Sequence, residues 1–187
     1  MDADLGRGLI CQARIDGSDI MPEADPPTIC GGNPTPTKPN TKYERRRTGF
    51  EMDLSTLRHS ASHIMAQAVK ELFPGTKLGI GPSIEEGFYY DFDKKKPFMP
   101  EDLEKIEKRM QEIISEGSKF TKEELKKEDA IKFFKKLGEP YKIELINELP
   151  DKTVSIYKHS NFTDLCKGPH VNSTKDIKAF KLLSIAG

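Results

Sequence analysis

The chain of 187 residues is long enough for one ordinary domain with its own hydrophobic core, and two full domains would be crowded. Its 30 basic and 30 acidic side chains cancel, which excludes the strong overall positive field of a basic nucleic-acid-binding domain and leaves only local patches for RNA. No segment approaches the roughly 20 apolar residues of a membrane span and no secretory signal is recognisable, so we expect a cytoplasmic protein that contacts no membrane.

Residues 1–50 are rich in proline, glycine and polar side chains and lack helical or strand periodicity. We expect a disordered N-terminal extension there, followed by one domain over residues 51–187. A basic cluster with one aromatic residue, KYERRR at 42–47, would contact an RNA backbone or simply be solvated. The three cysteines are irregularly spaced, which argues against a disulfide framework and leaves Cys166 as a free thiol or ligand.

The first predicted helix has Ser55 as its N-cap and runs to Phe73, before a proline and a glycine that end it. Apolar residues recur along it at helical spacing, from Leu57 to Leu72. Two short runs between glycines and a proline, at 78–80 and 88–92, have the composition of strands and are predicted to pair as a hairpin.

A second amphipathic helix is predicted from Pro100 to Gly117, and a third over 126–137. The apolar runs at 141–146, 153–157 and 179–185 are too short for independent helices. These patterns predict an α+β fold in two layers, with helices packed on a mainly antiparallel sheet. Because the chain stops directly after an apolar run, we expect that it is cut from a longer protein and truncated at the C-terminal end of this domain.

His59 and His63 lie four residues apart in the first helix, so their side chains share one face, one turn apart. On a helical wheel with Leu57 at zero, the aliphatic stripe centres near roughly 40° and the histidines near roughly 200–240°. The histidines therefore lie off the aliphatic stripe, where a stray pair of core histidines would not be expected.

Cys166 and His170 form a second pair in the segment DLCKGPH, where Gly168 and Pro169 favour a turn over a helix. Together the HxxxH and CxxxH patterns offer three imidazoles and one thiol, which are ligands that zinc prefers. Four such groups would close a structural zinc site or leave one position open for water.

Other interpretations of these four residues stay open. One histidine would take a proton from an attacking water without any metal, because imidazole titrates near working pH. In the plainest alternative the two histidines are surface residues and Cys166 is a small buried apolar group. The helix also lacks the glutamate of the metalloprotease pattern HExxH.

The chain resembles a known family through four motifs in a fixed order. They are RHSASHIMAQAVKELFP, GPSIEEGFYYDFD, DLCKGPHV and KAFKLLSIAG, at 58–74, 81–93, 164–171 and 178–187. The resemblance covers 54–187 and is to the second additional, or editing, domain of threonyl-tRNA synthetases, which alanyl-tRNA synthetases and freestanding editing proteins share in more divergent form. Pro169 and the last motif favour the threonyl branch over the alanyl one.

The resemblance implies hydrolysis of serine wrongly esterified to threonine tRNA. It implies an editing pocket formed by His59, His63, Cys166 and His170, and it matches three further positions around that pocket, Tyr90, Lys142 and Asp164. A histidine or Lys142 would position or activate the water, Asp164 would orient the aminoacyl group, and Tyr90 would shape the pocket. No cofactor is expected for this reaction, and Zn²⁺ on the same four residues is the alternative.

Without the resemblance, Tyr90 would be taken for core packing and Lys142 and Asp164 for surface charges. Gly81, Pro82 and Gly87 are most simply turn residues. The ubiquitin-like domain that precedes this region in the family is not recognisable in residues 1–50, and no aminoacylation core follows, so this chain is not expected to activate threonine. The expected partners are mischarged seryl-tRNA and the rest of a synthetase.

Three alternatives to a threonyl-type editing hydrolase remain. The chain would be a zinc-stabilised RNA-binding module without catalysis, an alanyl-type deacylase that acts in trans, or a degenerate fragment with neither activity.

Overall fold

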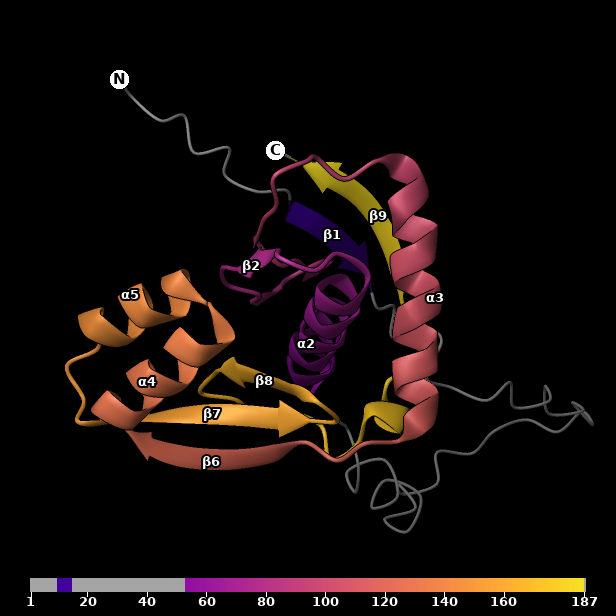
Figure 1. The fold of residues 1–187 in the computed structure, drawn as a ribbon. Helices are drawn as coiled ribbons and strands as arrows, with labels where there is room; N and C mark the ends of the chain where they lie inside the picture. Colours follow the sequence, from indigo (N-terminus) through magenta and orange to yellow (C-terminus); the bar gives the residue numbers. More distant parts are fainter. Residues whose placement is uncertain (1–9, 15–52, 187) are drawn as a thin grey trace, which may run out of the picture.

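The computed structural model describes residues 10–14 and 53–186, and the element labels below are those of Figure 1. The helices are α2 (Leu54–Leu72), α3 (Pro100–Glu116), α4 (Lys127–Leu137) and α5 (Pro140–Glu148), with a 3-10 turn at Thr174–Asp176. The strands are β1 (Ile10–Arg14), β2 (Lys77–Leu78), β3 (Ser83–Ile84), β4 (Gly87–Phe88), β5 (Phe92–Asp93), β6 (Thr121–Lys126), β7 (Thr153–His159), β8 (Phe162–Leu165) and β9 (Lys181–Ala186).

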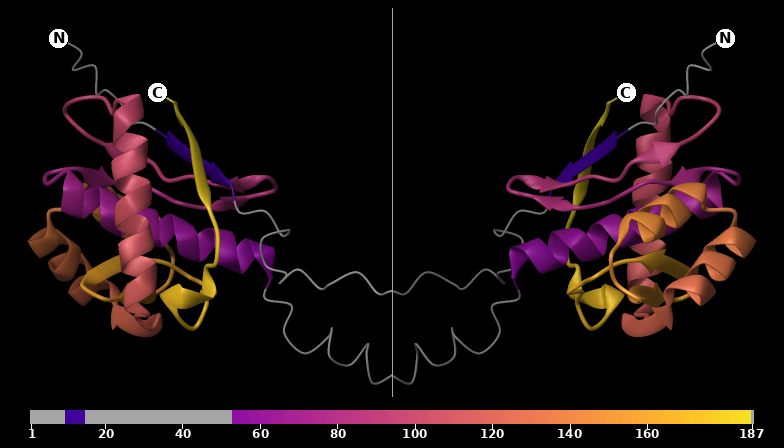
Figure 2. Two further views of the ribbon diagram at one scale, coloured as in Figure 1. Left: turned by 90° about the vertical axis from the view of Figure 1, so that its right-hand side faces the viewer. Right: turned by 90° about the vertical axis from the view of Figure 1, so that its left-hand side faces the viewer.

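The described strands form three antiparallel sheets. Their strand orders are β3-β4-β1-β9, β2-β5 and β6-β7-β8. Helix α2 runs through the middle of the fold, with α3 along one side, β1 and β9 behind, and the β6-β7-β8 sheet below α4 and α5 (Figure 1; Figure 2 gives the same arrangement from either side). The α+β class with helices packed on antiparallel sheets is confirmed, although the strands divide into three sheets where one was predicted.

Helix α2 begins one residue before the predicted cap. The carboxylate of Asp53, not the hydroxyl of Ser55, caps it by accepting the backbone N–H of Ser55 at 3.2 Å. Every residue from Ser60 to Val69 is buried, because the helix is covered on more than one side. The prediction of this helix is confirmed. His63 was predicted to lie off the aliphatic stripe of the helix, yet its side chain is about as deeply buried as the aliphatic residues.

Among the described residues, two hydrophobic cores stabilise the fold. The larger one lies around α2 and α3 and includes Ile64, Met110 and Ile113, all inaccessible to solvent. The smaller one lies between α4, α5 and β7 and is centred on Phe134 and Ile156. Burial of these side chains is the main stabilising contribution, at about 1.5–3 kcal/mol for each fully buried large residue.

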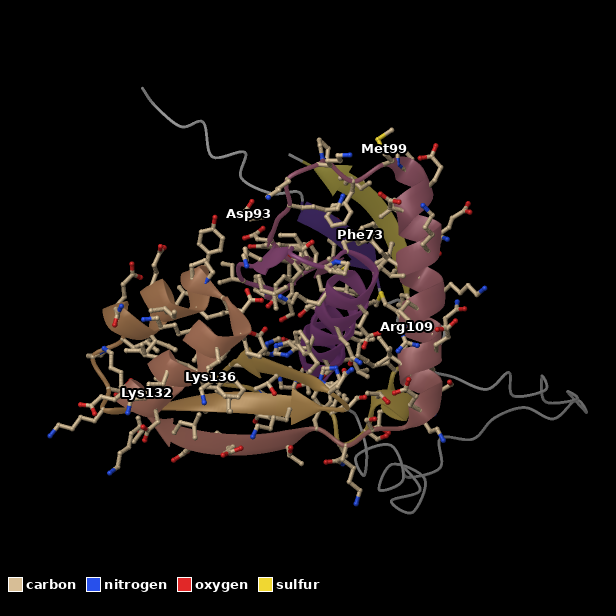
Figure 3. The ribbon with its side chains drawn as sticks, viewed as in Figure 1. Phe73, Asp93, Met99, Arg109, Lys132 and Lys136 are labelled. Atoms are coloured by element: carbon tan, nitrogen blue, oxygen red, sulfur yellow. The ribbon has the colours of Figure 1, made fainter. Side chains whose placement is uncertain are left out.

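Ion pairs between charged side chains connect helix α2 to the elements around it. On α3, Arg109 donates to Glu71 of α2 at 2.6 Å and to Glu112 at 2.8 Å, and the residue is labelled in Figure 3. Glu139, which is buried, pairs with Lys70 of α2 and accepts the backbone N–H of Leu78 at 2.8 Å. The Arg109 contact therefore connects α3 to the central helix, and the Glu139 contact connects the part of the chain that contains the smaller core to it.

Helix α5 was not predicted, and the inference that residues 141–146 are too short for a helix is wrong. A left-handed Gly138 ends α4, and Pro140 then occupies the first turn of α5, where its missing N–H costs nothing. Ile146 packs into the smaller core. Tertiary packing therefore supports a nine-residue helix that would be marginal alone.

The predicted second and third helices are confirmed, and Leu78 pairs with Phe92 as in the predicted hairpin. The apolar runs at 153–157 and 179–185, for which no helix was expected, overlap β7 and β9. No strand was predicted within residues 1–50. This prediction is wrong at Ile10–Arg14, where β1 pairs with β4 and β9.

The basic cluster at 42–47 and the rest of the predicted extension lie outside the described residues. Within the described part of the chain, no helix is long and apolar enough to cross a membrane.

Candidate functional site

Four side chains from two distant parts of the sequence converge beside α2. His59 and His63 project from the helix, and Cys166 and His170 come from the segment that follows β8. One ligand atom of each lies within 4.8 Å of one of every other. The predicted convergence is therefore observed, and we call these four residues the His/Cys cluster.

The thiol of Cys166 is at the centre of the cluster. Its Sγ lies 3.3 Å from Nε2 of His59 and 3.2 Å from Nε2 of His170. The backbone N–H of Gly168 donates to the same sulfur at 3.2 Å. Two imidazole nitrogens and one amide thus face a single sulfur atom.

Ring contacts fix the imidazole of His170 on several sides. Its centroid lies 4.3 Å from those of both His59 and His63, and its ring stacks on Phe120 at 4.9 Å and 7°. Tyr157 of β7 meets it edge-on at 4.5 Å. Because side chains from α2, from β7 and from the residue before β6 surround it, His170 has little freedom to rotate out of the cluster.

As predicted, Gly168 and Pro169 lie outside any helix; the segment that contains them is irregular, and it brings Cys166 and His170 together in the cluster. Gly168 has a φ of +76°, a conformation that L side chains rarely adopt, and its peptide bond to Pro169 is cis. A Cβ built on Gly168 would lie 2.3 Å from the hydroxyl oxygen of Tyr157. Glycine is therefore required both by the backbone and by the tyrosine beside it.

We expect Gly168→Ala to destabilise the chain by more than Gly75→Ala. Both glycines have positive φ, and a left-handed alanine costs about 1–2 kcal/mol at either position, but a Cβ at Gly75 meets nothing within 4 Å. At Gly168 the clash adds to this cost and pushes Tyr157 toward His170. Chemical denaturation of both variants measures the difference, and equal losses of unfolding free energy would contradict the proposed contact.

A second group of buried polar side chains lies next to the cluster. Lys142 of α5 and Asp164 of β8 form an ion pair with Nζ and Oδ1 at 2.6 Å, and both side chains are at most 3% exposed. The hydroxyl of Tyr90 donates to Oδ2 of Asp164 at 2.5 Å and lies 3.0 Å from Nζ of Lys142. The three residues form a closed triangle, and the reading of Lys142 and Asp164 as surface charges is wrong.

Further contacts fix the positions of Asp164 and Tyr90 in this triangle. The backbone N–H of Leu165 donates to Oδ1 of Asp164 at 2.8 Å, so both oxygens of the carboxylate are paired. Gly81 lies against the ring of Tyr90, and a Cβ there would come within 2.1 Å of it. Gly81 was expected only as a turn residue, but it also leaves room for the tyrosine.

Burial keeps the imidazoles of the site neutral. It lowers the pKa of His59, and this shift is opposed in part by a hydrogen bond that the imidazole donates to the backbone carbonyl of Pro169 and by the charge of Asp164. The pKa values of His63 and His170 are both well below the usual range, because burial and the neighbouring histidines disfavour protonation. The approach of His63 Nε2 to Asp164 at 3.9 Å is therefore not a salt bridge.

Burial also raises the pKa of the Cys166 thiol to about 11. The hydrogen bond from Gly168 opposes this shift but does not cancel it. Since the thiolate and not the thiol is the reactive nucleophile, Cys166 is a poor nucleophile at neutral pH in this environment.

The donor set of the cluster could hold a metal ion. Three imidazoles and a thiol have the composition of zinc sites, and Nδ1 of the buried His63 has no hydrogen-bond partner in the described residues. His170 has its other nitrogen 3.0 Å from the hydroxyl of Ser60, as metal-binding histidines usually do. The residues present therefore fit a divalent cation of the zinc type.

Two residues near the cluster were not predicted. Ser60 contacts His170 from within the HxxxH motif, and its position between the two histidines gave no separate signal. His159 is buried on β7 with both ring nitrogens unpaired among the described residues, and burial lowers its pKa to about 4. It is one of only four histidines in the chain, which was a usable signal.

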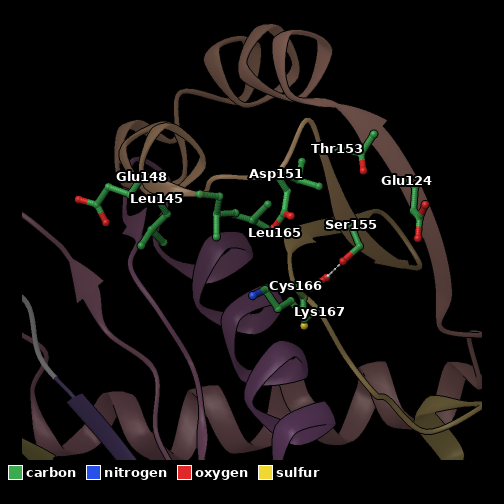
Figure 4. A pocket seen from close by; sticks show the side chains of 11 residues that line it. Glu124, Leu145, Glu148, Asp151, Thr153, Ser155, Leu165, Cys166 and Lys167 are labelled. Carbon is green, nitrogen blue, oxygen red and sulfur yellow. Dashed lines mark hydrogen bonds between the residues drawn. The ribbon is translucent and has the colours of Figure 1, made fainter.

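A cavity of about 560 Å³ borders Cys166 but none of the histidines (Figure 4). Its wall includes the carboxylates of Glu124, Glu148 and Asp151 together with apolar side chains of α5 and β7. An acidic wall of this kind repels a polyanion. This cavity is therefore a poor place for an RNA backbone.

Comparison with known proteins identifies similar sequences. Residues 154–187 match the model of the threonyl and alanyl tRNA synthetase second additional domain. The chain is 58% identical over 137 residues to a threonine–tRNA ligase of Lawsonia intracellularis, and 59% identical over 131 residues to one of Acetivibrio thermocellus. These alignments cover 73% and 70% of the chain.

A longer alignment includes the N-terminal residues. The threonine–tRNA ligase of Nitratidesulfovibrio vulgaris is 41% identical over 191 aligned positions, which cover 98% of the chain. The chain spans 21% of the length of the Lawsonia relative and 30% of the length of this one. It thus corresponds to a minor part of the proteins that it resembles.

Proposed function

From the premise that this chain is a relative of threonine–tRNA ligases and carries their second additional domain, we propose that it hydrolyses the ester bond of mischarged seryl-tRNA. The observation that carries the proposal is the convergence of His59, His63, Cys166 and His170 beside the buried triangle of Tyr90, Lys142 and Asp164. Neutral imidazoles next to fixed charges are suited to proton transfer on a bound ester.

The proposed reaction uses water as the nucleophile. A water oxygen bonds to the seryl carbonyl carbon, the bond from that carbon to the ribose oxygen breaks, and a proton passes from the water to the ribose oxygen. A thioester route through Cys166 is disfavoured because its thiol stays protonated at neutral pH.

The roles divide by exposure. His59 and His170 are partly exposed and neutral, so either imidazole has a lone pair with which to take the proton from water. His63, Lys142 and Asp164 are buried and form the rigid wall behind them. We assign to Asp164 and Tyr90 the shaping of the aminoacyl pocket, since all their polar atoms are held in place.

The proposed substrate preference follows from size. Serine lacks one methyl group of threonine, and a missing methyl changes binding by only about 1–3 kcal/mol. A synthetic site alone therefore cannot reject serine well, and a second site that excludes the larger threonine corrects the error. The proposed partners are threonine tRNA and the remainder of a synthetase, which would supply most of the tRNA contacts, and the proposed location is the cytoplasm.

Incubation with seryl-tRNA(Thr) tests the proposal. We expect the chain to release serine faster than the uncatalysed background, and His59→Ala to slow the release by about 100-fold, as removal of a general base does. Lys132→Ala, on the exposed face of α4, is the matched control and should leave the rate unchanged. Release at the background rate would refute the proposal, and equal rates for His59→Ala and the wild type would refute the role of His59 as the general base.

Zinc binding by the cluster is the second candidate, supported by the convergence of four donors within 4.8 Å. The four residues of the cluster would hold the ion, and a bound ion would polarise a carbonyl or water, or simply stabilise an RNA-binding module. Metal analysis separates the two candidates. About one zinc per chain, with unfolding on chelation and no serine release, would favour a structural role.

A further inference from the structure

The hydroxyl of Ser60 lies next to His170 of the His/Cys cluster and makes three contacts. Its Oγ donates to the backbone carbonyl of Thr56 at 2.8 Å, one turn earlier in α2. The backbone N–H of Val171 donates to the same Oγ at 3.0 Å. The third contact, also 3.0 Å, is with Nδ1 of His170. Ser60 is itself inaccessible to solvent, so no water competes for these contacts.

The number of hydrogens on the Ser60 hydroxyl indicates which atom is the donor in its contact with His170. A serine hydroxyl has one hydrogen to donate and two lone pairs to accept with. The hydrogen points to the carbonyl of Thr56, which cannot donate, and one lone pair accepts from Val171. The remaining lone pair faces His170, so Nδ1 must carry the hydrogen of this contact. The reverse arrangement would leave two acceptor oxygens facing each other at 2.8 Å.

We propose that Ser60 is a positioning residue that holds neutral His170 in the tautomer with hydrogen on Nδ1. In this tautomer the lone pair of Nε2 points at the sulfur of Cys166, 3.2 Å away. The hydroxyl of Ser60 thus determines which nitrogen of His170 carries the hydrogen and which one faces the thiol of Cys166 with a lone pair.

The tautomer determines what the cluster can do. A lone pair on Nε2 accepts a proton from water or coordinates a cation, whereas the other tautomer would present an N–H to the cluster and do neither. The consequence for catalysis rests on the proposed editing function. The tautomer itself does not, since it follows from contacts within the chain.

Nitrogen-15 NMR of the histidine side chains in the full 187-residue chain tests the proposal directly. We expect Nδ1 of His170 to give a pyrrole-type resonance and Nε2 a pyridine-type resonance in the wild type at neutral pH. In Ser60→Ala the acceptor for Nδ1 is lost, and the two resonances should move toward each other or exchange types. Ser60→Thr keeps the hydroxyl and should restore the wild-type pattern.

Ser62→Ala is the matched control for loss of a buried serine hydroxyl in the same helix. Ser62 is equally inaccessible, but its Oγ contacts the carbonyls of His59 and Gly81 and not His170. This variant should leave the His170 resonances unchanged. A pyridine-type Nδ1 in the wild type, or an unchanged pattern in Ser60→Ala, would overturn the proposal, and the wild-type spectrum decides even if the alanine variant does not fold.

A second measurement separates this proposal from the editing function. If seryl-tRNA is a substrate, Ser60→Ala should slow its hydrolysis by about 10- to 100-fold, the usual effect of losing the partner that orients an imidazole. An expected NMR pattern in a wild type that releases no serine would support the tautomer and refute the editing function. Full activity of Ser60→Ala with an altered tautomer would overturn the positioning role.

Discussion

Replacing Lys142 by methionine is expected to lower the free energy of unfolding by about 3–5 kcal/mol, the usual cost of leaving one partner of a buried ion pair uncompensated. The carboxylate of Asp164 would then keep only Tyr90 and the backbone of Leu165 as partners, at a position that is about 2% exposed. Urea denaturation followed by circular dichroism measures the loss. Because the pair also fixes the pocket wall, serine release should fall by about 100-fold.

The double variant Lys142→Met with Asp164→Asn tests whether the pair or its surroundings accounts for this loss. Removing both charges avoids an uncompensated ion, so the double variant should be more stable than the sum of the single changes predicts, by about 0.5–3 kcal/mol. Lys132→Ala, which breaks an exposed pair with Asp129, should change stability by at most about 0.5 kcal/mol. A Lys142→Met variant as stable as this control would contradict the buried pair.

Local sequence patterns predicted most of the helices well, but they did not predict the elements that depend on distant partners. The periodicity of α2 and α3, and the glycine that ends α3, depend on neighbouring residues alone and were identified with boundaries within about two residues. Helix α5 and strand β1 depend on distant partners, the smaller core for one and β9 for the other. Neither segment carries enough local signal to be recognised.

The same distinction holds for the candidate site. Helical spacing alone paired His59 with His63, and the turn at Gly168 and Pro169 was evident from composition. The ion pair of Lys142 with Asp164 was not predicted, because one partner lies on the helix that was missed and the other on a strand that was also missed. A buried ion pair is a property of tertiary packing, and only the resemblance singled out its members individually.

At His63 the requirements of activity and of folding stability can be told apart. Its imidazole is about 2% exposed, and its Nδ1 finds no hydrogen-bond partner among the described residues. A buried polar atom left unpaired costs about 1–3 kcal/mol, so the histidine weakens the fold at this position. A residue that destabilises the fold in this way is expected where activity requires it.

We therefore expect His63→Leu to keep or raise the free energy of unfolding, by up to about 1–3 kcal/mol. Because the wall behind His59 and His170 changes shape, serine release should slow by about 100-fold. The leucine side chain fills the space of the imidazole against Phe162 without an unpaired nitrogen. Met65→Leu, also buried on α2 but outside the cluster, is the matched control and should cost less than about 1.5 kcal/mol without loss of activity. Thermal or chemical denaturation, combined with the serine-release assay, checks both halves of the prediction. A stable but inactive variant would show that His63 is required for activity and not for folding. A variant that loses both stability and activity would instead indicate that His63 supports the fold.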